Sequence, residues 1–164
     1  MFPVSRLVVD PERFIQDPME SVGMGVVYTH TADGEALRAI SAVERLALID
    51  TYYHPHHATL TRMVDDCLEQ YGRCLIIDCH SFSAQPLPYE SDSNRPDICI
   101  GTDTYHTSKK LKGCLSSAFE AFGYFVAIDS PFSGTIVPLK HYRTDQRVSS
   151  VVRRRAIQND IGAR

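Results

Sequence analysis

The chain has 164 residues, and its 17 Lys and Arg against 20 Asp and Glu give a formal net charge of −3. This length suits one domain with a buried core, and 43% hydrophobic with 23% charged residues excludes a disordered chain, a collagen and a coiled coil. The acidic balance argues against a nucleic-acid partner, and the sequence has no apolar run long enough to span a membrane. Five cysteines without a CxxC pair, and a start without export-signal features, predict a cytoplasmic protein with reduced thiols.

The first half of the chain predicts one strand, loops and two helices. Residues 5–10 form a β-branched run that stops before Pro11, which is typical of a strand. Residues 14–37 predict mostly loop, with a short strand around 24–28. The spacing of apolar residues predicts a helix over 36–50 and, after Pro55 interrupts, a second helix over 56–71.

The second half predicts alternating strands and helices. Residues 73–80 hold four consecutive apolar residues, which favours a strand buried on both faces, and a long loop follows over 81–96. Further strands are expected at 97–101, 124–128 and 135–139, with a helix over 107–122. The alternation predicts a three-layer α/β fold, with a mostly parallel or mixed sheet flanked by helices. We assign residues 1–150 to a single domain and 151–164 to a basic, poorly anchored tail.

Asp78 and His80 are the strongest candidates for chemistry, because sites in open α/β sheets gather near the carboxyl ends of strands. Two residues apart on an extended segment, their side chains leave the same face. That suits a metal-binding imidazole oriented by a carboxylate. The alternative is a histidine bonded to a backbone carbonyl, with Asp78 capping the following turn. The residues alone leave both interpretations open.

A second group of histidines lies at 54, 56 and 57, around a proline. It has no HExxH pattern, so the residues predict either solvated imidazoles at a helix start or one histidine, His57, that points inward at a substrate. Cys79 is adjacent to His80 but on the opposite side of the strand, which makes a Cys–His dyad geometrically poor.

Seven short blocks of sequence follow one another between about residues 5 and 150. They are SRLVVD (5–10), GMGVVYT (23–29), YYHPHH (52–57), LIIDCHSF (75–82), DICIGT (97–102), PFSG (131–134) and PLKHY (138–142). In this order they resemble the N-formylglutamate amidohydrolase family. The resemblance is specific because the seven blocks follow one another in the order found in that family. A single block would not identify the family.

The resemblance implies a carboxypeptidase-like α/β fold and a zinc-dependent amidohydrolase. Its small-molecule substrate would be N-formyl-L-glutamate, cleaved to formate and glutamate in histidine degradation. By the same resemblance His80 is a metal ligand, Asp78 its supporting carboxylate and His57 a pocket residue. Arg6 and Arg13 match family arginines that are candidates to bind the substrate's carboxylates.

The chain also departs from the family pattern. Family members carry a His-Ser-Gly motif and an acidic residue upstream of the first block, which supply further metal ligands, and a glutamate where this chain has Arg153–Arg155. We therefore expect an incomplete domain with impaired activity, and an exposed apolar sheet edge that favours self-association. The alternatives are an inactive remnant or small-molecule binding module of the same fold, and a hydrolase of another N-acyl amino acid.

Overall fold

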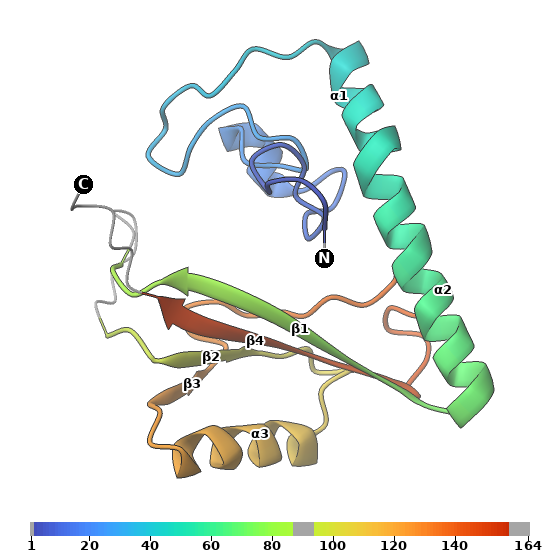
Figure 1. The fold of residues 1–164 in the computed structure, drawn as a ribbon, viewed down its shortest axis with the longest axis vertical. Coiled ribbons are helices and arrows are strands. Elements are labelled where there is room, and N and C mark those ends of the chain that lie inside the picture. Colours follow the sequence, from blue (N-terminus) through green and yellow to red (C-terminus); the bar gives the residue numbers. More distant parts are fainter. Residues whose placement is uncertain (1, 87–93, 158–164) are drawn as a thin grey trace. The chain divides into compact units, whose positions relative to one another are not determined.

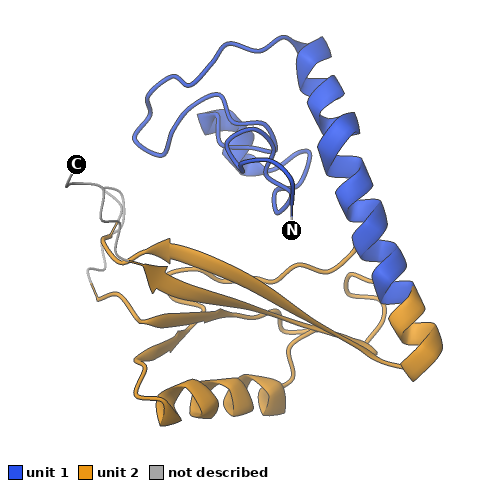
Figure 2. Ribbon diagram, in the orientation of Figure 1, with its two compact units in different colours: residues 1–65 blue, residues 66–164 orange. Residues whose placement is uncertain are grey.

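The computed structural model describes residues 2–86 and 94–157. The chain forms two compact units, residues 1–65 and residues 66–164 (Figure 2), and each has a hydrophobic core of its own. The predicted loop over 81–96 and the predicted tail over 151–164 both extend into residues outside the described range.

The first unit is built on a continuous helical run that continues into the second unit. After a single 3-10 turn, η1 (Pro18–Val22), the run comprises α1 (Ala42–Leu48), the π-helical turn η2 (Ile49–Tyr53) and α2 (His54–Tyr71). Ser41 caps the start of α1, and its capping box with Glu44 satisfies two backbone N–H groups. Both predicted helices form, but the first begins at Ala42 rather than at residue 36. Pro55 does not separate them, because the wider π turn just before it accommodates a residue that has no N–H to donate.

The predicted strand over residues 5–10 is wrong, and no strand forms over 24–28. The N–H groups of Val8 and Val9 both donate to the carbonyl of Ser5, at 2.8 and 3.2 Å, and close a turn. Val9 and Val26 are nevertheless fully buried, in a core with Ile49 and Tyr53. The β-branched pattern therefore marked buried positions rather than strand pairing.

The second unit contains a four-stranded mixed sheet and one helix. The elements are β1 (Cys74–Ser83), β2 (Ile98–Gly101), α3 (Lys109–Ala121), β3 (Val126–Ile128) and β4 (Val148–Ile157), in the sheet order β1-β4-β2-β3 (Figure 1). β1 pairs parallel with β4 and β2 parallel with β3, whereas β2 and β4 are antiparallel. The predicted α/β class is confirmed.

The position of β4 corrects the sequence-based account of the C-terminal region. The expected poorly anchored tail is wrong for residues 151–157, which form most of β4 between β1 and β2. Val148, Val151 and Val152 are buried there, and burial of these valines in the middle of the sheet holds the strand in place. Residues 158–164 lie outside the described range, and residues 135–139 form no strand.

α3 covers one face of the sheet over β2 and β3, as Figure 1 shows. The hydroxyl of Ser108 accepts a hydrogen bond from the N–H of Leu111 at 3.1 Å and so starts the helix. The core that the helix makes with the sheet consists of Leu111, Leu115, Phe119, Ile98, Ile100, Val151, Tyr124 and Val126. Because β1 lies at the edge of the sheet, Leu75 and Ile77 remain 49% and 52% exposed. The expectation that this strand is buried on both faces is therefore wrong.

Candidate active site

Asp78 and His80 lie on the half-buried face of β1, as the two-residue spacing predicted. Nε2 of His80 is 2.8 Å from Oδ2 of Asp78, and the two side chains are 28% and 22% exposed. The imidazole of His80 and the carboxylate of Asp78 are therefore in direct contact on this face. β1 continues to Ser83, and Asp78 therefore does not cap a turn after His80.

The strand register places an arginine next to this pair. His80 on β1 is paired with Arg154 on β4, and Arg154 is in turn paired with Cys99 on β2. Because side chains of laterally paired residues project from the same face of a sheet, these three residues share one face. Sequence reasoning missed Arg154 by placing it in a tail. The valines of VSSVV at 148–152 could have indicated a buried strand that carries the arginines into the sheet.

Cys99 shares that face but does not provide a nucleophile. Its side chain is fully buried, and its Sγ donates a hydrogen bond to the carbonyl of Phe132 at 3.2 Å. Burial raises the pKa of Cys99, and this effect exceeds the opposing effects of the Phe132 carbonyl and the Arg154 cation. The thiol is protonated at neutral pH, which fits a structural role.

Two other carboxylates near the ends of strands hold loops in place. Asp129 accepts hydrogen bonds from the N–H and the hydroxyl of Thr102, at 2.7 and 2.6 Å. Asp103 accepts from the N–H of Tyr105 at 2.8 Å and pairs with Arg143 at 3.2 Å. Desolvation acts to raise the pKa of Asp103, but these hydrogen bonds outweigh it and the pKa is lowered. Both carboxylates are therefore occupied by the fold.

In the first unit, Arg6 and Arg13 gather around the buried carboxylate of Asp10. Nη2 of Arg6 lies 2.7 Å and Nε of Arg13 3.8 Å from Oδ2 of Asp10, whose side chain is 2% exposed. The hydroxyl of Tyr28 donates to the same oxygen at 3.3 Å. Burial acts to lower the pKa of Arg6, but the charge of Asp10 and the other interactions outweigh it and raise that pKa. The two sequence-predicted arginines are thus brought together by one carboxylate.

His57, the third candidate in this unit, lies against the same segment. Its Nε2 is 2.8 Å from the carbonyl oxygen of Pro11, and its ring centroid is 4.2 Å from that of Tyr53. Burial lowers the pKa of His57, and the hydrogen bond to Pro11 opposes this only in part. His57 is therefore neutral at pH 7. The side chain of His54 is 54% exposed, and its Nε2 lies 3.7 Å from Oδ1 of Asp50.

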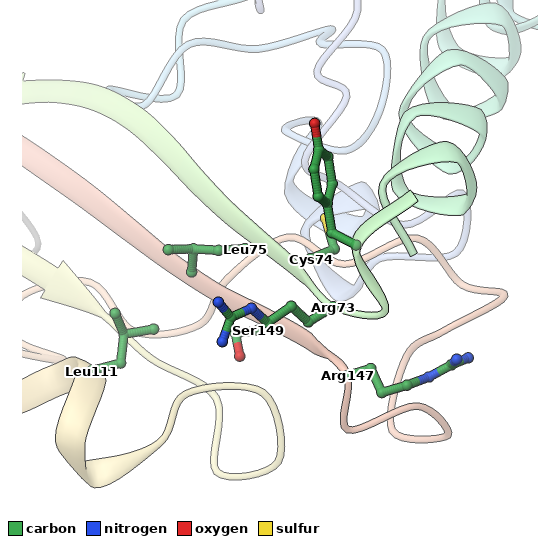
Figure 3. A pocket seen from close by; sticks show the side chains of 7 residues that line it. Arg73, Cys74, Leu75, Leu111, Arg147 and Ser149 are labelled. Carbon is green, nitrogen blue, oxygen red and sulfur yellow. The ribbon is translucent and has the colours of Figure 1, made fainter. Parts of the chain in front are cut away.

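A separate hollow of about 660 Å³ lies in the second unit, near the amino end of β1 (Figure 3). Its lining combines apolar and basic side chains: Tyr71, Arg73, Cys74, Leu75, Leu111, Arg147 and Ser149. Neither Asp78 nor His80 lines it. In the part of the chain that the structure describes, no helix has both the length and the apolar character needed to cross a membrane.

Comparison with known proteins links this chain to one family. The family model for N-formylglutamate amidohydrolase matches residues 1–152. The N-formylglutamate deformylase of Pseudomonas putida is 30% identical over 149 residues, a match that covers 84% of this chain and 54% of that protein. The N-formylglutamate deformylase of Pseudomonas aeruginosa is 27% identical over 158 residues, with 90% and 58% covered. The chain therefore spans a little over half the length of these relatives.

Solved structures show the same fold. The N-formylglutamate amidohydrolase from Ralstonia eutropha JMP134 superposes with a TM-score of 0.76 at 21% identity, over 92% of this chain and 62% of that one. The gene product Atu2144 from Agrobacterium tumefaciens gives 0.68 at 20% identity, over 96% and 59%. Since the family model covers most of the sequence, this chain belongs to the N-formylglutamate amidohydrolase family.

Proposed function

We propose that this chain belongs to a zinc-dependent amidohydrolase that cleaves N-formyl-L-glutamate to formate and glutamate, a reaction of histidine degradation. The observation that carries the proposal is the Asp78–His80 pair, 2.8 Å apart on one face of β1 in a chain of this family. Two relatives are named N-formylglutamate deformylase, which supports the choice of substrate.

The donor chemistry of the pair fits zinc, which binds imidazole nitrogens and carboxylate oxygens. His80 would hold the metal through a ring nitrogen. Asp78, whose Oδ2 lies 2.8 Å from this ring, would be the supporting carboxylate that orients it. When bound, zinc supplies a Lewis acid that polarises the formyl oxygen and activates water.

The residues of the first unit keep the roles that the family resemblance gives them. His57 is neutral at pH 7 and can therefore accept a proton there. Arg6 and Arg13 are cationic and remain the candidates for the substrate's carboxylates, because a guanidinium binds a carboxylate through two parallel hydrogen bonds.

The proposal is tested by formate release from N-formyl-L-glutamate, with added zinc and with a chelator. We expect turnover that the chelator abolishes and that His80→Ala reduces at least a hundredfold. Cys79→Ala, on the opposite face of the same strand, is the matched control and keeps the activity. Turnover that survives both the chelator and His80→Ala would contradict the proposal.

The same assay separates the alternative functions. Faster turnover of N-acetyl-L-glutamate or N-formyl-L-methionine would identify a hydrolase of another N-acyl amino acid. Folded protein that binds N-formyl-L-glutamate without any turnover would identify a binding module.

A further inference from the structure

We propose that Arg154 is a binding residue for a carboxylate group of the ligand, next to the Asp78–His80 pair. The proposal rests on the proposed function for the class of ligand, an N-acylated acidic amino acid. It assigns a new residue to that site and is argued from the second unit alone.

The first observation is the placement of Arg154 in the sheet. Its Cα is paired with that of His80 on one side and with that of Cys99 on the other. Neighbouring strands lie about 4.8 Å apart, so Arg154 and His80 are adjacent on one face. A formyl group at His80 leaves the substrate's α-carboxylate only three bonds away, within reach of the neighbouring side chain.

The second observation is the state of the guanidinium group. Nη1 of Arg154 is buried, and no acceptor within the described ranges of the chain is hydrogen-bonded to it. Three other arginines, Arg6, Arg143 and Arg147, each pair with an aspartate instead. Leaving a buried donor unsatisfied costs free energy, and a bound anion would remove that cost.

The third observation is the space around the group. A Cβ atom on Gly101 would lie 2.7 Å from Nη1 of Arg154 and would also collide with the carbonyl oxygen of Gly134. Any side chain at position 101 would therefore displace the guanidinium. The glycine at the end of β2 gives the arginine the room that it occupies.

The fourth observation is a pair of packed aromatic rings beside the guanidinium group. The guanidinium carbon of Arg154 lies 5.6 Å from the ring centroid of Phe132, which packs edge-on against Phe82 at 5.7 Å. Phe82 is 8% exposed and lies two residues after His80 on the same face of β1. The ring of Phe132 attracts the guanidinium by a cation–π interaction. The apolar side chains also exclude water, which strengthens an ion pair between Arg154 and a ligand.

Carboxylate is the favoured ligand because of the charges already present on this face. Asp78 is engaged by His80, and the thiol of Cys99 is protonated. Arg154 therefore provides a positive charge that these neighbours leave uncompensated. A carboxylate is planar and accepts two parallel hydrogen bonds, which matches the two parallel N–H donors of the Arg154 guanidinium.

The test uses glutarate, a dicarboxylate that cannot be hydrolysed, titrated by calorimetry into the full chain, with glutaramide as the uncharged comparison. We expect Arg154→Met to weaken glutarate binding about tenfold or more, as the loss of a charged hydrogen bond does. Arg155→Met is the matched control, because Arg155 is adjacent on β4 but projects from the opposite face. It should change the affinity less than twofold.

Arg154→Lys keeps the charge and the aliphatic stem. Its glutarate affinity therefore tests the proposal even if circular dichroism shows that Arg154→Met is unfolded. We expect an intermediate loss, since lysine lacks the two-pronged geometry. Three outcomes would overturn the inference. The wild-type chain does not bind glutarate, it binds glutarate no more tightly than glutaramide, or both Arg154 variants bind glutarate as tightly as wild type.

Formate release from N-formyl-L-glutamate, measured in parallel, separates the two proposals. Turnover with glutarate binding that is insensitive to Arg154 would leave the proposed function standing and reject this inference. Glutarate binding that depends on Arg154, in a chain that shows no turnover, would support this inference and reject the proposed function.

Discussion

Two regions of the molecule place arginines among ionisable groups, and they differ in how the charges are satisfied. In the first unit, the buried carboxylate of Asp10 is contacted by Arg6, Arg13 and the hydroxyl of Tyr28. On the sheet of the second unit, Nη1 of Arg154 is buried with no hydrogen-bond partner in the described part of the chain. A complete charge cluster stabilises a fold by its own contacts, whereas an incomplete one is suited to a ligand. The difference predicts that the contacts around Asp10 contribute mainly to stability, whereas Arg154 contributes mainly to ligand binding.

The largest effect is expected from removing the carboxylate at the centre of the first region. Asp10→Ala should lower the free energy of unfolding by about 3 kcal/mol, the lower end of the range for breaking a buried pair, because Arg6 is half exposed. Urea denaturation measures this change. Asp33→Ala, at an exposed aspartate, is the control and should have little effect. A loss below 1 kcal/mol for Asp10→Ala would mean that this cluster does not hold the unit together.

The second effect concerns the pair on β1. Asp78→Asn keeps the shape of the side chain but removes the charge that orients His80, so zinc affinity should fall by about ten- to a hundredfold. Competition with a chromophoric chelator measures the affinity. Ser81→Ala, on the other face of β1, is the control. Equal affinities in wild type and Asp78→Asn would remove Asp78 from the site.

The third effect tests whether the first region has only a structural role. If Arg6 also binds a substrate carboxylate, Arg6→Ala should raise KM for N-formyl-L-glutamate about tenfold with kcat nearly unchanged. Arg13→Ala provides the same test for the second arginine. A lower unfolding midpoint with an unchanged KM for both variants would confine the two arginines to holding Asp10.

The smallest effect is a pH dependence of stability that comes from His57. Its pKa in the folded chain is lowered from the ordinary 6.5, mainly by burial, so the unfolded state binds more protons than the folded state just below pH 6.5. Stability from this group is present above pH 6.5 and is lost as the pH falls from 6.5 toward the lowered value. Urea denaturation at pH 7.5 and pH 5.8 should therefore show a smaller drop in His57→Gln than in wild type. Equal drops in wild type and His57→Gln would contradict the assignment.

The sequence predicted the features that depend on local periodicity. The two-residue spacing of Asp78 and His80 placed both side chains on one face of a strand, and the structure has them 2.8 Å apart. The helical spacing over 107–122 predicted α3, which runs from Lys109 to Ala121.

The features that the sequence did not predict depend on contacts between distant segments. The β-branched run over residues 5–10 is buried in a core without pairing as a strand, because burial and strand pairing favour the same residue types. Arg153–Arg155 resembled a solvated tail, yet the pairing of β4 with β1 carries Arg154 to the side of His80. Strand order is set by long-range pairing, and no local pattern around residue 154 encodes its neighbour.

The most direct test of this account is the zinc content of the purified chain after dialysis, measured by elemental analysis for wild type, His80→Ala and Cys79→Ala. The account predicts about one zinc per chain in wild type and in Cys79→Ala, and almost none in His80→Ala. Equal zinc content in all three proteins, or none in the folded wild-type chain, would contradict the assignment of the metal site to His80.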